Sequence, residues 1–190
     1  MSAGGILSGE EIREAFVRKE IEIEPFEPNH LNPASIDLRL GPSVLYMGAN
    51  QGNIDVKKAQ MVSTDYEAEE IGSTGILLYP YNLYLMHTIE RICTHRYVPV
   101  LDGKSSLGRL GVSVHETAGY GDPGFDGQYT LEVRVFRPTR VYAGMRFCQM
   151  RFHTLVGSCD DYARHGNYVG GSAQGPVISL VHRQFQEKKK

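Results

Sequence analysis

Short stretches of alternating apolar and polar residues recur along the chain, and turn-forming residues separate them. Between Ala34 and Leu40, apolar side chains occupy every second position, which is the period of a strand with one face against a core. Comparable apolar stretches predict further strands over residues 43–47, 76–80, 83–89, 97–101, 128–136 and 146–155. One short helix is indicated over residues 8–18, where Ser8 and Glu11 form a capping-box pattern ahead of apolar residues at helical spacing.

Many short strands and one helix predict a mainly β protein, a barrel or a sandwich with a small helical addition. The length of 190 residues suits one domain, with or without a C-terminal arm. Residues 48–75 are the least regular part, and we expect variable loops there. From Cys159 onward the chain is rich in Gly, Tyr, Asn and Ser without periodicity, which fits either a frayed terminus or an arm that closes over a ligand.

Composition narrows the classes of function. The formal net charge of −2 gives no basic field for a nucleic-acid or membrane-surface protein, although one anionic ligand could still bind in a local basic pocket. No apolar stretch approaches the roughly 20 residues that span a bilayer. The N-terminal segment has no cationic region, and three widely spaced cysteines indicate reduced thiols, so we expect a cytoplasmic protein.

The segment Asp102–Gly111 combines a lysine, two adjacent hydroxyls and an arginine. If its middle forms a helical turn, Ser105 and Arg109 share one face, and the first N–H groups of the turn point outward beside Lys104 and Ser106. This chemistry suits a phosphate group. An ordinary serine N-cap with a surface arginine explains the same residues, and the spacing is not that of a P-loop.

Small and turn-forming residues fill the segment His115–Gly127, so backbone could approach a ligand closely there. Its N–H and C=O groups could read the edge of a base, and Asp122 could accept a hydrogen bond from a sugar hydroxyl. An ordinary Asp-Pro-Gly turn is an equally good explanation of the same residues.

The strand over residues 128–136 has one apolar and one polar face, and Glu132 lies on the polar one. A carboxylate in such a position is usually solvated. If the face instead lines a pocket, desolvation would favour the protonated form, and Glu132 could exchange protons near neutrality. Zinc-dependent deamination is not indicated, because the sequence lacks the His-x-Glu and Cys-x-x-Cys spacings that hold the metal.

Taken in order, these segments resemble the dCTP deaminase family of the trimeric dUTPase superfamily. The resemblance rests on Asp102–Gly111, Thr117-Ala118-Gly119, Asp122–Phe125, Thr130-Leu131-Glu132, Ile6-Leu7-Ser8, Pro33–Gly41 and Gly144–Gln149. It covers nearly the whole chain except residues 48–75. It implies a distorted, dUTPase-like β-barrel over residues 1–158, with a short N-terminal helix, and a flexible arm over residues 159–190 that closes over the active site. A homotrimer with active sites between subunits is implied as well.

The resemblance also implies roles for individual residues. Glu132 would take a proton from water and deliver it to the cytosine ring and the leaving ammonia, while Ser105 and Arg109 would position the water and the carboxylate. Ala118 would lie against the base, and Asp122 would bind the deoxyribose hydroxyl. The other substrate-binding residues implied are Lys104, Ser106, Leu107, Gly108, Thr130, Leu131, Gln149, Tyr162, Asn167 and Gln174. Magnesium would bind through the substrate triphosphate, and no zinc is expected.

Gly119-Tyr120 bears on whether one reaction takes place or two. Deaminase-only members have His-Arg after the Thr-Ala pair, whereas Gly followed by an aromatic residue is the pattern of bifunctional members. The pattern implies conversion of dCTP to dUMP, pyrophosphate and ammonia, with dUMP supplied for thymidylate synthesis and Asp122 placed to orient water at the α-phosphate. The alternatives are a deaminase that releases dUTP and, with less support, a pure dUTPase or a non-catalytic nucleotide sensor. Feedback inhibition by dTTP is a further expectation from the family.

Two departures from the family pattern affect the arm. Asn167-Tyr168 stands where the family carries Lys-Tyr, so one phosphate-binding charge is lost or is supplied elsewhere. The spacing from Tyr168 to Gln174 is also longer than usual.

Overall fold

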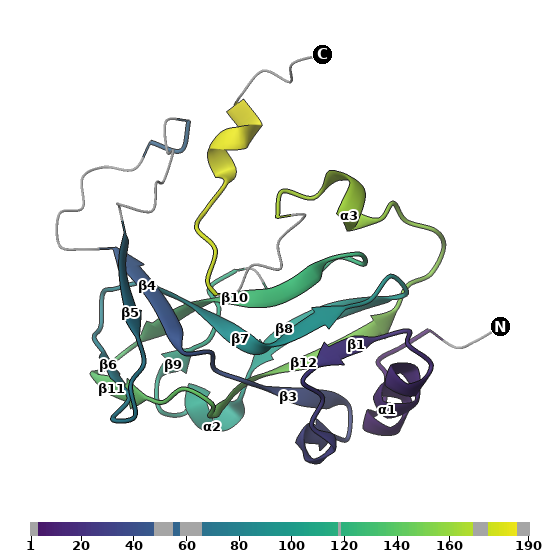
Figure 1. The fold of residues 1–190 in the computed structure, drawn as a ribbon, viewed down its shortest axis with the longest axis horizontal. Helices are drawn as coiled ribbons and strands as arrows, with labels where there is room; N and C mark the ends of the chain where they lie inside the picture. Colours follow the sequence, from purple (N-terminus) through teal and green to yellow (C-terminus); the bar gives the residue numbers. More distant parts are fainter. Residues whose placement is uncertain (1–3, 48–54, 58–65, 118, 169–174, 186–190) are drawn as a thin grey trace.

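Strands make up most of the regular structure of this chain (Figure 1). The computed structural model describes residues 4–47, 55–57, 66–117, 119–168 and 175–185. Its helices are α1 (Gly9–Val17), α2 (Ser105–Gly108) and α3 (Tyr162–His165), with 3-10 helices η1 (Pro28–His30) and η3 (Val181–Phe185). Its strands are β1 (Glu22–Glu24), β2 (Leu31–Asn32), β3 (Ser35–Arg39), β4 (Ser43–Met47), β5 (Tyr66–Glu70), β6 (Ile76–Leu78), β7 (Tyr84–Cys93), β8 (Tyr97–Gly103), β9 (Val112–Ser113), β10 (Asp126–Val135), β11 (Thr139–Val141) and β12 (Arg146–Thr154).

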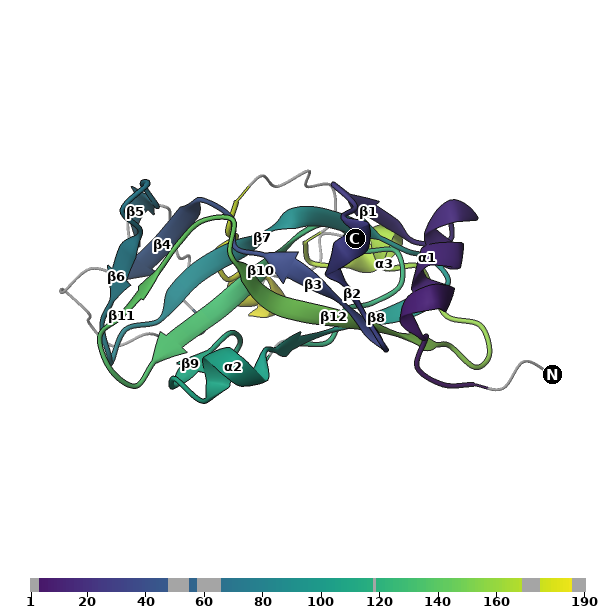
Figure 2. The same ribbon diagram turned by 90° about the horizontal axis from the view of Figure 1, so that it is seen from below.

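The strands form three antiparallel sheets. The main sheet has the order β5-β4-β7-β10-β9, and β1 adds to it through β7. A four-stranded sheet has the order β2-β3-β12-β8, and β11 pairs with β6. In both views α1 lies at one end of the molecule, and β5, β6 and β11 lie at the other (Figures 1 and 2). Among the described residues the sheets stay open rather than closing into a continuous barrel. This mainly β arrangement agrees with the predicted distorted β-barrel class.

The sheets enclose a single hydrophobic core built from the apolar faces predicted by the period-two pattern. On β10, Leu131 and Val133 are fully buried, whereas Thr130 and Glu132 on the opposite face are half-buried. The predicted helix is also confirmed: Ser8 caps α1 by accepting a hydrogen bond from the Glu11 backbone N–H at 3.1 Å. Among the described residues, no helix is both long and apolar enough to cross a membrane.

One local expectation from the pattern was wrong, and one strand was missed. Strand β3 is not half-buried, because Asp37 is buried along with its apolar neighbours; its carboxylate accepts hydrogen bonds from Lys104 Nζ at 2.5 Å and Asn32 Nδ2 at 2.8 Å. These partners compensate the cost of burying the charge. Within residues 48–75, where variable loops are expected, Tyr66–Glu70 forms strand β5, which the pattern did not predict. Its residues are largely exposed, so it has no apolar face for the pattern to reveal.

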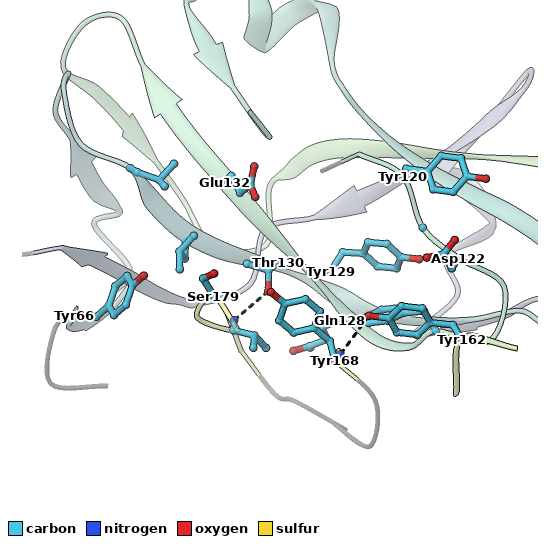
Figure 3. Close-up of a pocket in the computed structure, with 15 residues that line it drawn as sticks. Tyr66, Tyr120, Asp122, Gln128, Tyr129, Thr130, Glu132, Tyr162, Tyr168 and Ser179 are labelled. Atoms are coloured by element: carbon cyan, nitrogen blue, oxygen red, sulfur yellow. Dashed lines mark hydrogen bonds between the residues drawn. The ribbon is translucent and has the colours of Figure 1, made fainter. Parts of the chain in front are cut away.

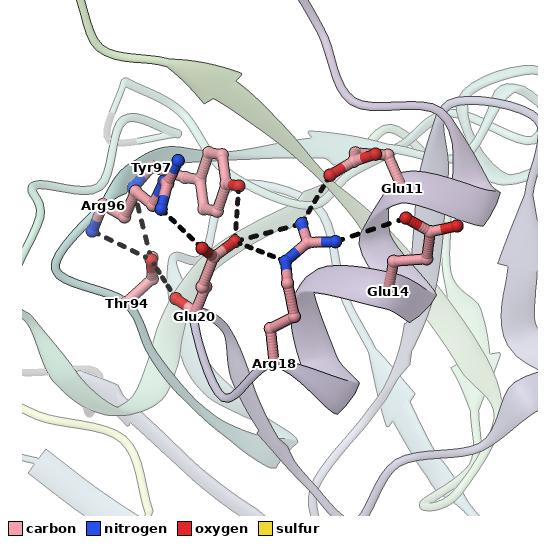
Figure 4. Close-up of polar contacts among 7 residues, drawn as sticks. All are labelled: Glu11, Glu14, Arg18, Glu20, Thr94, Arg96 and Tyr97. Carbon is pink, nitrogen blue, oxygen red and sulfur yellow. Dashed lines mark hydrogen bonds and ion pairs between the residues drawn. The ribbon is translucent and has the colours of Figure 1, made fainter.

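A polar network joins the end of α1 to the start of β8 (Figure 4). Glu20 accepts hydrogen bonds from the Tyr97 hydroxyl at 2.9 Å and from Arg96 Nη1 at 2.5 Å, and its backbone carbonyl accepts one from Thr94. Arg18 pairs with the same carboxylate at 3.0 Å. Burial pushes the pKa of Glu20 upward, but the Tyr97 hydroxyl and the Arg18 guanidinium outweigh it and hold that pKa below its usual value. The network fixes the residues that lead into β8, and β8 carries part of the candidate site.

His87 is a buried histidine in the middle of β7. The Ser43 N–H donates to Nε2 at 3.3 Å, so Nδ1 carries the proton and donates to the Thr88 carbonyl at 2.9 Å. Gly41 leaves room for the ring, since a Cβ there would lie 2.1 Å from Cε1. Burial lowers the pKa of His87 below 6.5, so the folded protein holds the ring neutral.

We therefore expect an acid-dependent loss of stability from His87. Because the folded-state pKa lies below the unfolded value near 6.5, the contribution is fully present above that pH and is lost as pH falls towards the folded-state pKa. Uptake of a single proton changes the free energy of unfolding by at most about 1.4 kcal/mol per pH unit. Denaturant titrations between pH 5 and 8 give the free energy of unfolding at each pH. This free energy should change less steeply with pH in His87→Gln than in the unchanged protein. Equal slopes would contradict this assignment.

Candidate active site

The polar face of β10 lines a cavity of about 400 Å³ (Figure 3). Its walls come from β10, from the loop that precedes β10 and from the C-terminal segment (residues 162–168 and 175–185). Tyr66 of β5, and Leu83 and Leu85 at the start of β7, complete them. The lining residues are Tyr66, Leu83, Leu85, Tyr120, Gly121, Asp122, Phe125, Gln128, Tyr129, Thr130, Glu132, Tyr162, Tyr168, Val177 and Ser179. Six of these side chains are aromatic, which suits the faces of a flat ring such as a nucleobase.

Glu132 presents its carboxylate at the wall of this cavity. Oε2 accepts hydrogen bonds from the backbone N–H groups of Glu116 at 3.3 Å and Thr117 at 3.2 Å. Both donors belong to the loop that follows β9, and β9 pairs with β10 two residues beyond Glu132. The backbone therefore fixes the orientation of the carboxylate, which is what a group that moves protons to and from a bound ring requires.

The loop that carries Asp122 is held against β8 by backbone hydrogen bonds. Leu101 N–H donates to the Gly119 carbonyl at 2.6 Å, and Gly121 N–H donates to the Pro99 carbonyl at 2.8 Å. A Cβ at Gly119 would lie 2.6 Å from the Leu101 carbonyl oxygen, so glycine is required for this close approach. The loop is thus an extra strand-like segment on β8, and it delivers Asp122 and the exposed Tyr120 to the cavity.

The C-terminal segment lies over the polar face of β10, and in Figure 1 it rises from β10 to η3. Gly175 N–H donates to Gln128 Oε1 at 2.9 Å, and Val177 N–H donates to Thr130 Oγ1 at 3.0 Å. Tyr162 and Tyr168, together with Val177 and Ser179, complete the wall of the cavity. The C-terminal segment is therefore part of the site in this conformation.

A second group of predicted residues lies elsewhere. Ser105, Ser106 and Arg109 are exposed on and after α2, and none of them lines the cavity. In Figure 1, α2 lies below the main sheet and η3 lies above it. Beside α2, Gln149 Nε2 donates to the Gly103 carbonyl at 3.0 Å, and Lys104 is the partner of Asp37 already described.

Within one chain the structure therefore brings together only part of the predicted site. Glu132, Asp122, Thr130, Tyr120 and Tyr162 share the cavity. Leu107 and Leu131 have their side chains in the core, so Leu131 can meet a ligand only through its backbone. Gly108 is exposed on α2, and Gly119 lies in the loop on β8. Asn167 lines a neighbouring cavity that shares Asp122 and Tyr162, while Ala118 and Gln174 lie outside the described residues.

Several lining residues were missed in the sequence. Gln128 was placed only on a polar strand face, and its role in holding Gly175 depends on where the C-terminal segment returns. Tyr129 falls on the apolar face of β10, which predicted burial and no role in the site. Phe125 and Tyr168 were also missed, because they meet the predicted Tyr162 only in the folded chain. The one available signal was the presence of aromatic residues before and after the strand over residues 128–136.

Cys93, His95 and Asp161 form a chain of contacts that looks like a nucleophilic triad. The Cys93 sulfur lies 3.8 Å from His95 Nε2, and His95 Nδ1 lies 2.6 Å from the Asp161 carboxylate. However, burial and nearby acidic residues raise the pKa of the Cys93 thiol to about 11, so the thiolate is scarce at neutral pH. The contact instead secures the start of α3, where Asp161 also caps Ala163 N–H. Among the described residues, no group of three or more His, Cys, Asp or Glu side chains is arranged to hold a metal ion.

Comparison with known proteins adds to this geometry. A family model described as dCTP deaminase-like matches residues 6–155. The chain belongs to the dCTP deaminase-like family. A relative from Leptospira biflexa, named "dCTP deaminase, dUMP-forming", is 44% identical over 183 residues, covering 96% of this chain and 99% of the relative. A protein of the same name from Cytophaga hutchinsonii is 42% identical over 182 residues, which cover 96% of this chain and 99% of that protein.

A solved structure shares the fold. The 2′-deoxycytidine 5′-triphosphate deaminase from Agrobacterium tumefaciens superposes with a TM-score of 0.63 at 23% identity, over 80% of this chain and 49% of that chain. This chain thus spans about half the length of that protein, and the likeness bears on the fold alone. The match to the dCTP deaminase-like family ends at residue 155, whereas the full-length relatives also cover the segment that contributes Tyr162 and Tyr168 to the cavity.

Proposed function

We propose that this protein converts dCTP and two water molecules to dUMP, pyrophosphate and ammonia. The observation that carries the proposal is the Glu132 carboxylate, fixed by two backbone N–H groups in the wall of an aromatic cavity that also contains Asp122. The names of the two relatives, each matched over nearly its whole length, support the same reaction.

Deamination needs one group that both accepts and donates a proton. Glu132 takes a proton from the attacking water as its oxygen bonds to C4 of the cytosine. The same carboxyl group passes that proton to N3 of the ring. It then takes the second proton from the new C4 hydroxyl and gives it to the amino group, so the C4–N bond breaks, ammonia leaves and the C4 carbonyl forms. One carboxyl group held at a fixed position can serve both transfers, because it is ionised again after each of them.

The nucleoside would lie in the cavity with its base among the aromatic side chains. Asp122 would accept a hydrogen bond from the deoxyribose hydroxyl, and the polar face of β10 would border the sugar through Thr130. Closure of an arm over residues 159–190 fits the contacts that Gly175 and Val177 make with β10. The arm would exclude bulk water while leaving the attacking water in place.

Phosphate binding is assigned to the region around α2. Lys104, Ser105, Ser106 and Gln149 offer a cation, hydroxyls and an amide to phosphate oxygens. These donors fit an anion rather than a divalent cation, so magnesium would be carried by the triphosphate, where it would neutralise phosphate charge. A nucleotide that shares the deoxyribose and the triphosphate, such as dTTP, would compete for the same site.

A homotrimer would bring the residues around α2 together with the residues of the cavity. Ser105 and Arg109 are exposed and outside the cavity of their own chain, although the proposed chemistry requires them near Glu132. If α2 of one subunit faces the cavity of the next, every interface contains one complete site. The exposed Tyr120, Leu110 and Phe136 offer apolar surface for such an interface.

Cleavage of the triphosphate would follow in the same cavity. Glycine at position 119 lets the loop approach β8 closely, and Tyr120 then projects beside Asp122. Asp122 would orient a second water towards the α-phosphorus, where the new P–O bond forms as the bond to the pyrophosphate oxygen breaks. The net products are dUMP and pyrophosphate.

We expect dCTP and Mg²⁺ incubated with the protein to yield dUMP, pyrophosphate and ammonia in equal amounts. Chromatography with a parallel ammonia assay measures all of them over time. Accumulation of dUTP would show a deaminase without the second activity. Cleavage of dUTP without any reaction of dCTP would indicate a dUTPase, and binding without turnover would indicate a nucleotide sensor.

A further inference from the structure

The hydroxyl of Tyr129 is a buried polar group without a partner. The side chain is only 9% exposed, and its oxygen makes no hydrogen bond within the part of the chain that the structure describes. A buried hydroxyl that loses its water contacts without gaining a partner is unfavourable, so such groups are rare in folded proteins and each calls for an explanation. Tyr129 also lines the cavity of the candidate site, so a ligand there could change its surroundings.

The surroundings of the hydroxyl point to Asp122. A Cβ on Gly121 would lie 2.5 Å from the Tyr129 oxygen, so the hydroxyl packs against the residue that precedes Asp122. Figure 3 shows the Tyr129 ring pointing towards the Asp122 carboxylate. Gly121 is therefore required for this approach, since any side chain there would displace the ring or the loop.

Two contacts hold Tyr129 in place. Its backbone N–H donates to Thr88 Oγ1 at 3.0 Å, and its ring meets the edge of Phe125 with centroids 4.9 Å apart. Burial, followed by the nearby charge of Asp122, raises the pKa of the phenol above its usual value. The hydroxyl is consequently a fixed donor that keeps its proton at any physiological pH.

We propose that Tyr129 is a positioning residue for recognition of the sugar: its hydroxyl donates to one carboxylate oxygen of Asp122 when a nucleotide binds. The other carboxylate oxygen is then directed at the substrate's 3′-hydroxyl and accepts a hydrogen bond from it. This inference rests on the proposed function, because it assigns Asp122 to the deoxyribose. It explains why a hydroxyl is retained on the buried face of β10, where the pattern otherwise selects apolar side chains.

The test compares dCTP with 2′,3′-dideoxy-CTP, which lacks the hydroxyl that Asp122 would bind. The unchanged protein should prefer dCTP in kcat/KM, and Tyr129→Phe should reduce that preference about tenfold, mainly through KM for dCTP. Activity on the dideoxy nucleotide should change little. Loss of activity on both nucleotides by the same factor would overturn the inference, because a general structural effect does not depend on the 3′-hydroxyl.

Tyr97→Phe provides the matched control. Tyr97 is also a buried tyrosine, but its hydroxyl donates to Glu20 in the network remote from the cavity. We expect this variant to lower the melting temperature and to leave the preference for dCTP unchanged. Tyr129→Phe should not lower the melting temperature of the nucleotide-free protein, since it removes an unpaired group. A clear drop would mean that the hydroxyl already has a partner, which would contradict the inference.

The same measurements separate this inference from the proposed function. If the unchanged protein does not deaminate dCTP, the proposed function fails. If it deaminates dCTP and Tyr129→Phe keeps the full preference over the dideoxy nucleotide, only the role of Tyr129 fails.

Discussion

Glu132→Gln should abolish ammonia release from dCTP, with kcat lowered about 10³-fold or more. Glutamine keeps the length of the side chain and an oxygen that can accept from the Glu116 and Thr117 N–H groups. It cannot take a proton from water, so attack on C4 loses its base. Single-turnover measurements with dCTP, combined with calorimetric titration of the nucleotide, separate the chemical step from binding.

Asp126→Asn is the matched control for this variant. Asp126 lies on the same strand, but its carboxylate pairs with Arg91 at 2.6 Å outside the cavity. We expect near-normal ammonia release from this control and nearly unchanged dCTP affinity for Glu132→Gln. Normal deamination by Glu132→Gln would show that another group is the base.

Two inactive variants should restore each other's activity when they form mixed trimers. Arg109→Ala removes a residue exposed after α2, and Glu132→Gln removes the carboxylate in the cavity. Each variant alone should be inactive. If a site takes Glu132 from one subunit and Arg109 from the next, random mixing at equal ratio leaves about a quarter of the sites with both groups intact.

The measurement needs subunits that have exchanged or have been refolded together. Sedimentation analysis should first show that the mixture and both parents are trimers of the same size. Recovery of about a quarter of the activity would then place Arg109 across the interface from Glu132. Mixed trimers that stay inactive would mean that each site draws both residues from one chain.

Much of the fold could be predicted because burial imposes a period on the sequence. The strand over residues 128–136 illustrates this, since β10 buries the predicted apolar positions and turns Thr130 and Glu132 to the other side. The helix at the N-terminus was equally clear from Ser8, because a capping residue acts within four positions of the chain. In both cases the deciding interactions are local or repeat along one element.

The rest depended on contacts between distant parts of the chain. No periodicity indicated that Gly175 and Val177 return to β10, because they are held by backbone N–H groups that every residue except proline possesses. Burial of Asp37 depends on Lys104, which lies 67 positions away. The unpaired state of Tyr129 was equally hidden, since an aromatic residue on an apolar face is ordinarily a core residue.

Strand β8 supports two parts of the predicted site. At Pro99 and Leu101 it holds the loop that delivers Asp122 to the cavity of its own chain, and beyond Gly103 it leads directly into α2. In the proposed trimer, α2 faces the cavity of a neighbour, so one short strand would position residues of two catalytic centres. Each subunit would thus contribute to two sites through the same strand.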